Sequence, residues 1–583
     1  MFDPERPMTP AQVGQGGALV IGAAAGGGAG RYSFYTGSQA THSGSGFNAS
    51  ADNLWFPFVG SYDITLITAS EPITDTGTTT LPVTVLPEPA GGTLATGVRI
   101  GALQGVSGCY YCDAYSDNRI MVRAAATSDG KLIAAFDQKH IAADSGDSIL
   151  ARVFDPDSEQ FGDLLDADTN RGQGVSLLGL GEGNPQRYHQ FDVAMAENGD
   201  AMVVFMQQTL TGTGAAPSNR GHVFASFYDA TAETLGTPIR LDNEGDPLFG
   251  VGGASNPKVV IWREGAETHA LAVWAPGRFA TYDGGTGAWT ASATIHYNVS
   301  NGTSSEPILV GNASGRAFLL WEDQADVFAI VFDEGAWDVP AGDIAPLYTA
   351  AVDDVQTDLA ASSDGTAIVL IGHEEGTTED PVYAIRYDGA QWQSADQIGD
   401  SADIATMAPA AWGTAYTSVS LAQIAMDASG NALAVWNAVV GAGYPVAVSS
   451  YYTAGGTFGA FKPIAGVATE TDAEFVHQPP YDNIGPVRIG LALDGDRAIV
   501  TYPVSSFSLP AGSGAAQLVF RRYDVSDGAW SARTLVDTKP NHKHGHSEVR
   551  LRSDGSALAV YEVWPAYSDF AGTVYAREIG AAE

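Results

Sequence analysis

Cysteine is almost absent from the chain, and its scarcity limits covalent and metal chemistry. The two cysteines, Cys109 and Cys112, lie in the run Gly-Cys-Tyr-Tyr-Cys-Asp. A zinc site built on cysteine pairs needs a second pair at this spacing, and the sequence has none. A local disulfide between Cys109 and Cys112 is predicted if the protein leaves the cytosol, and two free thiols are the alternative.

Positive charge is also scarce. Lysine and arginine together number 28, against 67 aspartates and glutamates, which gives a formal net charge of −39. Such a chain repels nucleic acids and anionic membranes at long range, so we expect neither as a partner.

Long apolar runs and long amphipathic helical patterns are missing as well. The apolar run at residues 17–25 is too short to span a membrane, so no membrane insertion is expected. Asp3 and Glu5 precede it, where a secretory signal needs a basic region, so no convincing signal peptide is found. The composition predicts an extracellular or virion-surface protein that is released by lysis, exported by another route or expressed without its leader.

Glycine, with 69 residues, and a repeated hairpin dominate what is present. In all copies but the third, an alternating apolar strand leads into a turn of Asp, Asn or Ser followed by Gly, and a second apolar strand ends in a large residue. The clearest copy ends at Trp436, after a turn at Ser429 and Gly430. Eight copies occur, at residues 122–136, 192–205, 259–274, 308–321, 359–371, 423–436, 487–502 and 549–561.

A third strand follows each hairpin, and in the copies before the last a short fourth strand comes after it. The third strand ends in Tyr or Phe and then Asp, and a Trp often comes next, as in residues 382–392. Four antiparallel strands repeated eight times predict an all-β, eight-bladed β-propeller. Seven blades are the alternative, because the turn of the third copy, at residues 265–267, is degraded.

The two ends of the repeat region predict how the ring closes. The last copy stops after its third strand, and residues 97–103 resemble an orphan fourth strand that would complete it. We therefore assign the propeller to residues 97–583, a linker to 88–96, a β-sandwich to 30–87 and an extension to 1–29.

The segment before Pro87 does not share the repeat. Two alternating strands, at residues 60–68 and 78–86, resemble the final hairpin of PKD-type immunoglobulin-like domains. The Trp-x-Phe-Gly-Asp-Gly motif of that family is absent. The resemblance implies a small N-terminal Ig-like β-sandwich that acts as a spacer or docking element.

The hairpin consensus, clearest at residues 424–436, resembles the repeats of sialidase-like propellers. The turns after the third strands are similar to shortened Asp boxes, and we expect their Asp and Trp residues to be structural. The arginine triad and the Tyr/Glu pair that the resemblance would imply cannot be assembled, and no hydrolase, zinc-protease or phosphate-loop motif occurs.

Histidine placement predicts a working face. His140 and His373 follow second strands. Five further histidines precede first strands, namely His189, His477, His542, His544 and His546. All seven should therefore share the face that carries the blade-to-blade loops. We predict a ligand-binding face from Tyr110, Tyr111, His140, His189, His373 and His477, and a divalent metal site from His542, His544 and His546. A solvated polar loop is the alternative for the three clustered histidines, and packing is the alternative for Tyr110 and Tyr111.

These observations leave three functions open. The main prediction is a non-enzymatic binding or display protein of a virion or bacterial surface, with protein partners in an assembly and a surface glycan as ligand. The alternatives are a secreted glycan-active hydrolase or lyase with its site at the propeller mouth, and a structural assembly scaffold. The sequence favours a protein without enzymatic activity over an enzyme, and no catalytic residue is assigned.

Overall fold

The computed structural model describes two parts of the chain, an N-terminal group of strands and a β-propeller. The described residues are 11–14, 18–21, 31–36, 52–55, 60–69, 76–86, 94–101, 122–139, 147–167, 190–211, 218–242, 255–275, 277–295, 307–339, 344–350, 355–373, 380–400, 416–440, 444–465, 475–476, 489–505, 517–537, 542–565 and 573–581. Within these ranges the structure contains no helix with the length and apolar character of a membrane span.

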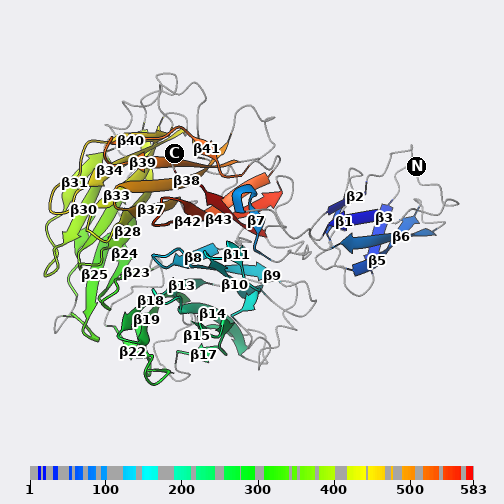
Figure 1. Cartoon of the computed structure of the whole chain (residues 1–583), viewed down its shortest axis with the longest axis horizontal. Helices are drawn as coiled ribbons and strands as arrows, with labels where there is room; N and C mark the ends of the chain where they lie inside the picture. The colour runs from blue at the N-terminus through cyan, green and yellow to red at the C-terminus, as the bar shows by residue number, and fades with distance from the viewer. Residues whose placement is uncertain are drawn as a thin grey trace.

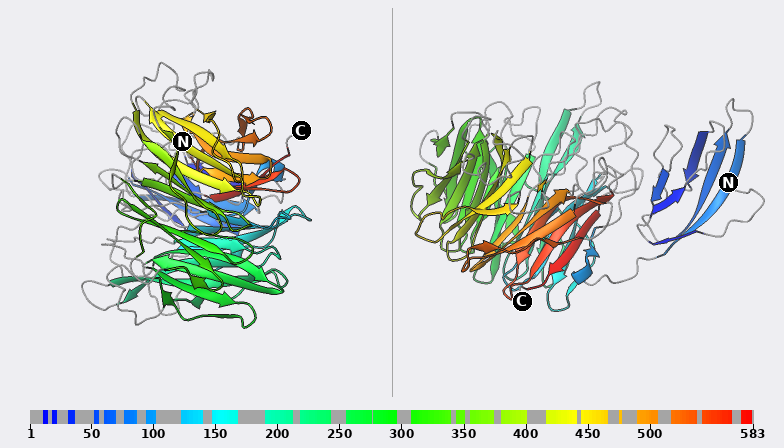
Figure 2. Two further views of the ribbon diagram at one scale, coloured as in Figure 1. Left: turned by 90° about the vertical axis from the view of Figure 1, so that its left-hand side faces the viewer. Right: turned by 90° about the horizontal axis from the view of Figure 1, so that it is seen from above.

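Eight antiparallel sheets follow one another around a ring (Figures 1 and 2), which confirms the eight-bladed propeller predicted from the repeat. In several blades the fourth strand is split into two short pieces that both pair with the third strand. Blade 8 takes its fourth strand from the segment that precedes blade 1 in the sequence.

Blade 1 has β8 (Val122–Ala126), β9 (Leu132–Lys139), β10 (Asp147–Asp155), β11 (Gln160–Phe161) and β12 (Leu165–Asp166). Blade 2 has β13 (Phe191–Met195), β14 (Ala201–Thr211), β15 (Ser218–Asp229), β16 (Thr234–Leu235) and β17 (Ile239–Arg240). Blade 3 has β18 (Ser255–Glu264), β19 (Glu267–Ala275), β20 (Arg278–Asp283), β21 (Ala288–Trp289) and β22 (Ala293–Thr294). Blade 4 has β23 (Ile308–Gly311), β24 (Ala317–Asp323), β25 (Asp326–Asp333), β26 (Ala336–Trp337) and β27 (Tyr348–Thr349). Blade 5 has β28 (Val355–Ala361), β29 (Ala367–His373), β30 (Pro381–Tyr387) and β31 (Asp396–Asp400). Blade 6 has β32 (Tyr416–Met426), β33 (Ala432–Val440), β34 (Tyr444–Tyr452) and β35 (Lys462–Ala465). Blade 7 has β36 (Phe475–Val476), β37 (Gly490–Asp494), β38 (Arg497–Ser505), β39 (Gln517–Asp524), β40 (Ala529–Trp530) and β41 (Thr534–Leu535). Blade 8 has β42 (His542–Leu551), β43 (Ala557–Pro565) and β44 (Thr573–Ile579), with β7 (Val98–Arg99) as its fourth strand.

The hairpin turns show why the repeat folds as it does. In blade 6 the Asp427 carboxylate accepts hydrogen bonds from the backbone N–H groups of Ser429 and Asn431, at 2.8 and 2.9 Å. Gly430 has a φ of 84°, a left-handed conformation that side chains disfavour. The Asp-x-x-Gly sequence therefore fixes a tight turn between the first and second strands.

The apolar core consists of eight layers, each between two neighbouring blades. Trp436, for example, is fully buried among residues of blades 5 and 6, including Leu370 and Val448. The layer between blade 8 and blade 1 contains Val560 and Phe136, so the last blade packs against the first. Each blade thus depends on both neighbours for burial of its two faces.

The ring is closed by η1 (Leu94–Thr96) and β7. Strand β7 pairs with β44, where Tyr575 lies opposite Arg99 and Ala576 opposite Val98. This strand falls within the segment 97–103 in which the sequence suggests a fourth strand.

The first strands of neighbouring blades contact one another around the axis. We call the end of the ring where these strands begin the mouth face, because the connections from blade to blade and from second to third strands lie there. The opposite end carries the hairpin turns, and we call it the turn face.

The N-terminal strands form two sheets of their own. One has the order β1 (Ala11–Gly14), β6 (Thr76–Leu86), β5 (Gly60–Ala69) and β3 (Arg31–Thr36), and the other pairs β2 (Ala18–Ile21) with β4 (Asp52–Trp55). Strands β5 and β6 form the antiparallel hairpin expected from the sequence. The PKD-type or Ig-like assignment of this part is not shown and stays a prediction.

Candidate functional site

Few of the side chains predicted to bind a ligand lie in the described ranges. His373 does, as the last residue of β29 at the mouth face, and only 3% of its surface is exposed. The remaining residues of the predicted face and the cysteine pair lie outside these ranges, namely Tyr110, Tyr111, His140, His189, His477, Cys109 and Cys112.

The predicted metal cluster has a different backbone setting from the one expected. His542, His544 and His546 lie within the first strand β42 rather than in a loop before it, and β42 has an irregular register against β43 between His544 and Ser547. Their placement in a loop is therefore corrected. The metal site proposed for them stays a prediction.

His373 belongs to a group of three rings at the junction of blades 4 and 5, which we call the Tyr–His cluster. The hydroxyl of Tyr348, on β27, lies 3.0 Å from His373 Nε2. Tyr383, on β30, packs against both rings, with centroid separations of 5.3 Å to Tyr348 and 5.5 Å to His373. The imidazole is buried whereas both tyrosines are only partly buried, so the phenols form the outer side of the cluster.

A second polar cluster lies on blade 2, also at the mouth face. Asp242 Oδ2 lies 2.8 Å from His222 Nδ1 and accepts a hydrogen bond from Arg240 Nη2 at 2.9 Å. Asp242 Oδ1 accepts the backbone N–H of Val223 at 3.0 Å. Burial acts to raise the pKa of Asp242, but the hydrogen bonds and charges of His222 and Arg240 outweigh it and hold this pKa below its usual value. The saturated carboxylate indicates a brace rather than a reactive group.

This cluster gives a testable stability effect. We expect Asp242→Asn to lower the free energy of unfolding by about 2 kcal/mol near neutral pH, because it removes a charged acceptor from Arg240 and His222. A folded pKa below the unfolded one stabilises the fold above about pH 4, and this gain is lost as the pH falls through the folded pKa. Thermal unfolding at neutral and acidic pH should therefore show a difference from wild type that shrinks in acid; an equal difference at both pH values would contradict the ion pair.

A register ring surrounds the axis near the mouth. It has one residue from each first strand. On the second strand of each repeat we take the position just before the large residue, such as Trp436 in blade 6; the ring residue is the one that pairs with this position. These eight positions, in blade order, are Arg123, Asp192, Lys258, Ile308, Asp358, Gln423, Gly490 and Glu548.

The carboxylates of this ring join one blade to the next. Asp192 accepts the backbone N–H of Val259 at 3.1 Å, and Asp358 accepts that of Ile424 at 2.8 Å. Burial raises the pKa of Asp192, although the charge of Lys258 acts to lower it. The ring therefore stabilises the first strands, with its acceptors already in use.

The Asp and Trp residues after the third strands have the structural role expected from the sequence. Asp388 accepts the backbone N–H groups of Ala390 and Gln391, at 3.0 and 2.9 Å, and these bonds lower its pKa. Trp392 packs on Tyr387 and on Phe318 of blade 4. The carboxylate closes the turn, and the indole fills space between two blades.

No protein-family model and no curated protein matches the chain. Among solved structures, a PL25 ulvan lyase bound to -[GlcA(1-4)Rha3S]- is similar at 10% identity and a TM-score of 0.42, over 83% of this chain and 98% of that one. The polysaccharide lyase Uly1 is similar at 10% identity and 0.37, over 65% and 88%. The NanB sialidase from Streptococcus pneumoniae is similar at 9% identity and 0.35, over 91% and 84%.

These comparisons correct the main prediction of function. The similar propellers are polysaccharide lyases and sialidases, so the prediction of a non-enzymatic binding or display protein is wrong, and the glycan-active alternative agrees better. Their sequences are too distant to carry residue roles over to this chain, whose chemistry has to be argued from its own side chains.

The sequence did not reveal the partners of His373. Tyr348 is 25 residues away and belongs to another blade. The signal that was available is positional: Tyr348 lies in the last piece of a fourth strand and Tyr383 near the start of a third strand, so both lie at the mouth face, as His373 does. A third group, Glu267, His269 and Asp283, lies at the turn face and was not singled out either.

Proposed function

We propose that the chain is a glycan-active enzyme that works outside the cell and cleaves an acidic polysaccharide by β-elimination at the mouth face. The observation that carries this proposal is the 3.0 Å contact between the Tyr348 hydroxyl and His373 Nε2. A phenol held by an imidazole is a pair that can take up and return one proton.

Tyr348 and His373 each perform one part of the proton transfer. Neutral His373 accepts the phenolic proton of Tyr348, and the phenolate oxygen removes the proton from the carbon next to the sugar carboxylate. The electron pair of that C–H bond forms the C4–C5 double bond as the C4–O4 bond breaks. Tyr348 then donates the proton that it removed to the leaving O4, and the proton held by His373 returns to Tyr348, so both side chains end in their starting states.

The partner of the tyrosine favours elimination over hydrolysis. A glycoside hydrolase places two carboxyl groups, or a tyrosine with its carboxylate, across the scissile bond. In the Tyr–His cluster the hydroxyl of Tyr348 lies 3.0 Å from an imidazole nitrogen, Nε2 of His373. An imidazole partner suits proton removal, which requires no water and no covalent sugar intermediate.

The burial of the cluster fits this division of roles. His373 is enclosed, so its proton is exchanged through Tyr348 rather than directly with water. Tyr348 is partly exposed and is the group that a sugar could reach. Packing of the Tyr383 ring against both partners restricts their orientation, which is the condition for efficient proton transfer.

The charge of the chain predicts how such an enzyme responds to salt. A net charge of −39 repels a polyanionic substrate, and screening shortens the reach of that repulsion to about 8 Å near physiological ionic strength. We expect KM for an acidic polysaccharide to fall as salt is raised from low to physiological levels, with little change in kcat.

A polysaccharide screen tests the proposal. Uronate-containing and neutral polysaccharides are incubated with the full chain at low and physiological salt, and both ultraviolet absorbance from the new double bond and reducing ends are followed. The expected result is absorbance and reducing ends in equal amounts on a uronate polymer. Reducing ends without absorbance would indicate hydrolysis, and neither product on any polymer would overturn the proposal.

A further inference from the structure

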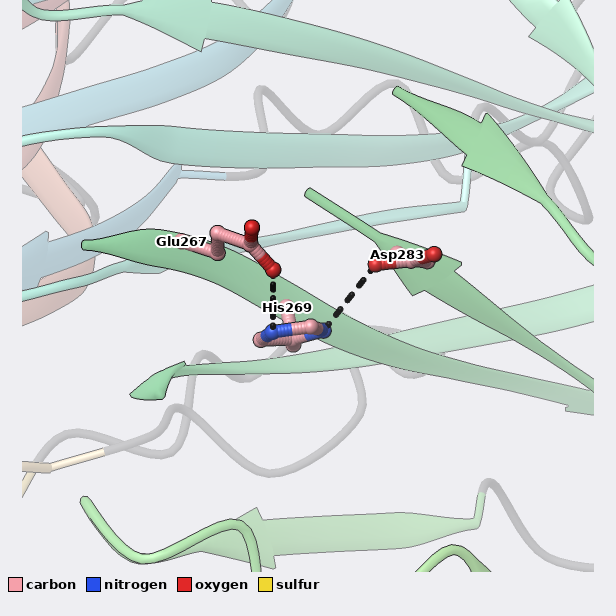
Figure 3. A group of neighbouring side chains, drawn as sticks. All are labelled: Glu267, His269 and Asp283. Atoms are coloured by element: carbon pink, nitrogen blue, oxygen red, sulfur yellow. Dashed lines mark ion pairs between the residues drawn. The ribbon is translucent and has the colours of Figure 1, made fainter. Parts of the chain in front are cut away.

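A group of three ionisable side chains lies on blade 3 at the turn face, which we call the blade-3 cluster. Glu267 and His269 come from β19, and Asp283 ends β20 (Figure 3). His269 lies between the two acids, with Nε2 3.8 Å from Glu267 Oε2 and Nδ1 3.8 Å from Asp283 Oδ1. One ligand atom from each residue can be chosen so that all three lie within 4.8 Å of one another.

The local sequence explains the arrangement. Strand β18 turns into β19 through two residues, Gly265 and Ala266, so Glu267 already belongs to the strand. Side chains two apart on a strand share a face, which puts Glu267 and His269 on the same side. Ala270 pairs with Tyr282, and this register places Asp283 beside His269.

Blade 4 offers a comparison at the equivalent place. Ala317 pairs with Phe332 there as Ala270 pairs with Tyr282 in blade 3, so Arg316 corresponds to His269 and Asp333 to Asp283. Arg316 Nε donates to Asp333 at 3.0 Å. In blade 4 the permanently charged Arg316 therefore neutralises the Asp333 carboxylate. In blade 3 the equivalent position holds the imidazole of His269, and a second carboxylate, that of Glu267, lies beside it.

The turn after β20 approaches Glu267 closely. A Cβ on Gly285 would lie 2.7 Å from Glu267 Oε2, and one on Gly284 would lie 2.3 Å from the carbonyl oxygen of Thr268. Two successive glycines therefore let the backbone of this turn approach the carboxylate, which any other residue pair would push away.

The imidazole is oriented and has an unused nitrogen. Trp262 stacks on His269, with ring centroids 5.8 Å apart and planes 21° from parallel. His269 Nε2 is buried and has no hydrogen-bond partner within the described residues. A buried ring nitrogen without a partner is costly unless something binds it.

We propose that Glu267, His269 and Asp283 bind a divalent cation of the zinc class. One imidazole nitrogen and two carboxylate oxygens are ligands that Zn²⁺ accepts, whereas Ca²⁺ and Mg²⁺ prefer all-oxygen sets. Tetrahedral bonds of the usual length need ligand atoms about 3.3 Å apart, whereas one chosen ligand atom from each of the three side chains lies within 4.8 Å of the other two. The carboxylates can close this gap because the side chains of Glu267 and Asp283 are 55% and 49% exposed.

The site is independent of the proposed enzymatic function, since it lies at the opposite end of the blades from the Tyr–His cluster. A bound cation would connect β19 to the turn after β20, as the Arg316–Asp333 ion pair connects the same elements of blade 4. The expected consequence is a gain in thermal stability with added zinc.

Calorimetric titration of the untagged full chain with Zn²⁺ tests the proposal. His542, His544 and His546 are first replaced by alanine, so that this second histidine group cannot bind the metal. One zinc ion should bind per chain and raise the Tm, and Mg²⁺ should bind far more weakly. Glu267→Gln and His269→Gln should each weaken zinc binding at least about tenfold, the effect of losing one ligand.

Glu264→Gln is the matched control, because Glu264 is an exposed acid on the same hairpin and outside the cluster. It removes the same charge as Glu267→Gln and should leave the zinc affinity within about twofold, a surface-charge effect. The proposal is overturned if the parent chain takes up no zinc, or if Glu264→Gln weakens binding as much as Glu267→Gln. A Tm that follows pH but not zinc would mean that a proton alone occupies the cluster, which also overturns it.

Discussion

Replacement of Tyr348 by phenylalanine is expected to lower the kcat for polysaccharide cleavage by about 10²- to 10⁴-fold, the usual contribution of a positioned general base. The variant keeps the ring that packs on His373 and Tyr383 and loses only the hydroxyl that lies 3.0 Å from His373 Nε2. KM should change little, because the hydroxyl acts on the transition state more than on the bound sugar. Initial rates of double-bond formation measure both constants.

Tyr282→Phe is the control for this experiment. Tyr282 is also a partly buried tyrosine between two blades, packed on Phe227 and Trp289, but it lies towards the turn face. Its loss of a hydroxyl should leave kcat within about twofold, since it is not positioned as an acid or base. Equal activity of Tyr348→Phe and wild type on a polymer that wild type cleaves would remove the Tyr–His cluster from the mechanism.

Removal of the closing strand is expected to abolish stable folding of the propeller. A chain that begins after residue 101 lacks Leu94 and Ile100, which are 8% and 1% exposed in the layer between blades 8 and 1. Burial of two aliphatic side chains is worth about 2–5 kcal/mol each. The shortened chain also loses three hydrogen bonds. The N–H groups of Ile100 and Gly101 donate to the carbonyl oxygen of Val574, and Arg152 donates to the carbonyl oxygen of Ile100. The sum approaches the whole free energy of unfolding of an ordinary domain, about 5–15 kcal/mol.

Two further chains make this prediction decisive. A chain that begins at residue 90 loses the N-terminal strands but keeps η1 and β7, so its propeller should retain the Tm of the full chain. Ile100→Ala in the full chain should lower the free energy of unfolding by about 2–5 kcal/mol. Circular dichroism and size exclusion during heating distinguish the cases. A folded monomer from the chain that begins after residue 101 would show that β7 is dispensable.

A search for catalytic motifs could not have found the Tyr–His cluster. The motifs that were sought place their residues close together in sequence, as in Gly-x-Ser-x-Gly or His-Glu-x-x-His. Tyr348, His373 and Tyr383 come from a fourth, a second and a third strand of two blades, and no spacing connects them. A site assembled between blades leaves no contiguous signature in one sequence.

The sequence by itself determined the parts of the fold that depend on local interactions. Alternation of apolar residues specified the strands, and turns such as Asp427-Ala-Ser-Gly430 specified the hairpins, because carboxylate capping and a positive φ act over four residues. Eight repeats of one unit then predicted eight blades. It also placed His373 at the end of a second strand, where the structure has it.

Only the tertiary structure decided which side chains meet between elements. It paired His373 with Tyr348 across a blade junction, and His269 with Asp283 where blade 4 has an arginine ion pair. It aligned Arg123, Asp192 and Lys258 at one register around the axis, although these residues are far apart in the chain. The physical reason is that strand register and blade packing set these contacts only when all eight layers are in place, and the sequence of one repeat does not specify which side chains of the next blade it meets.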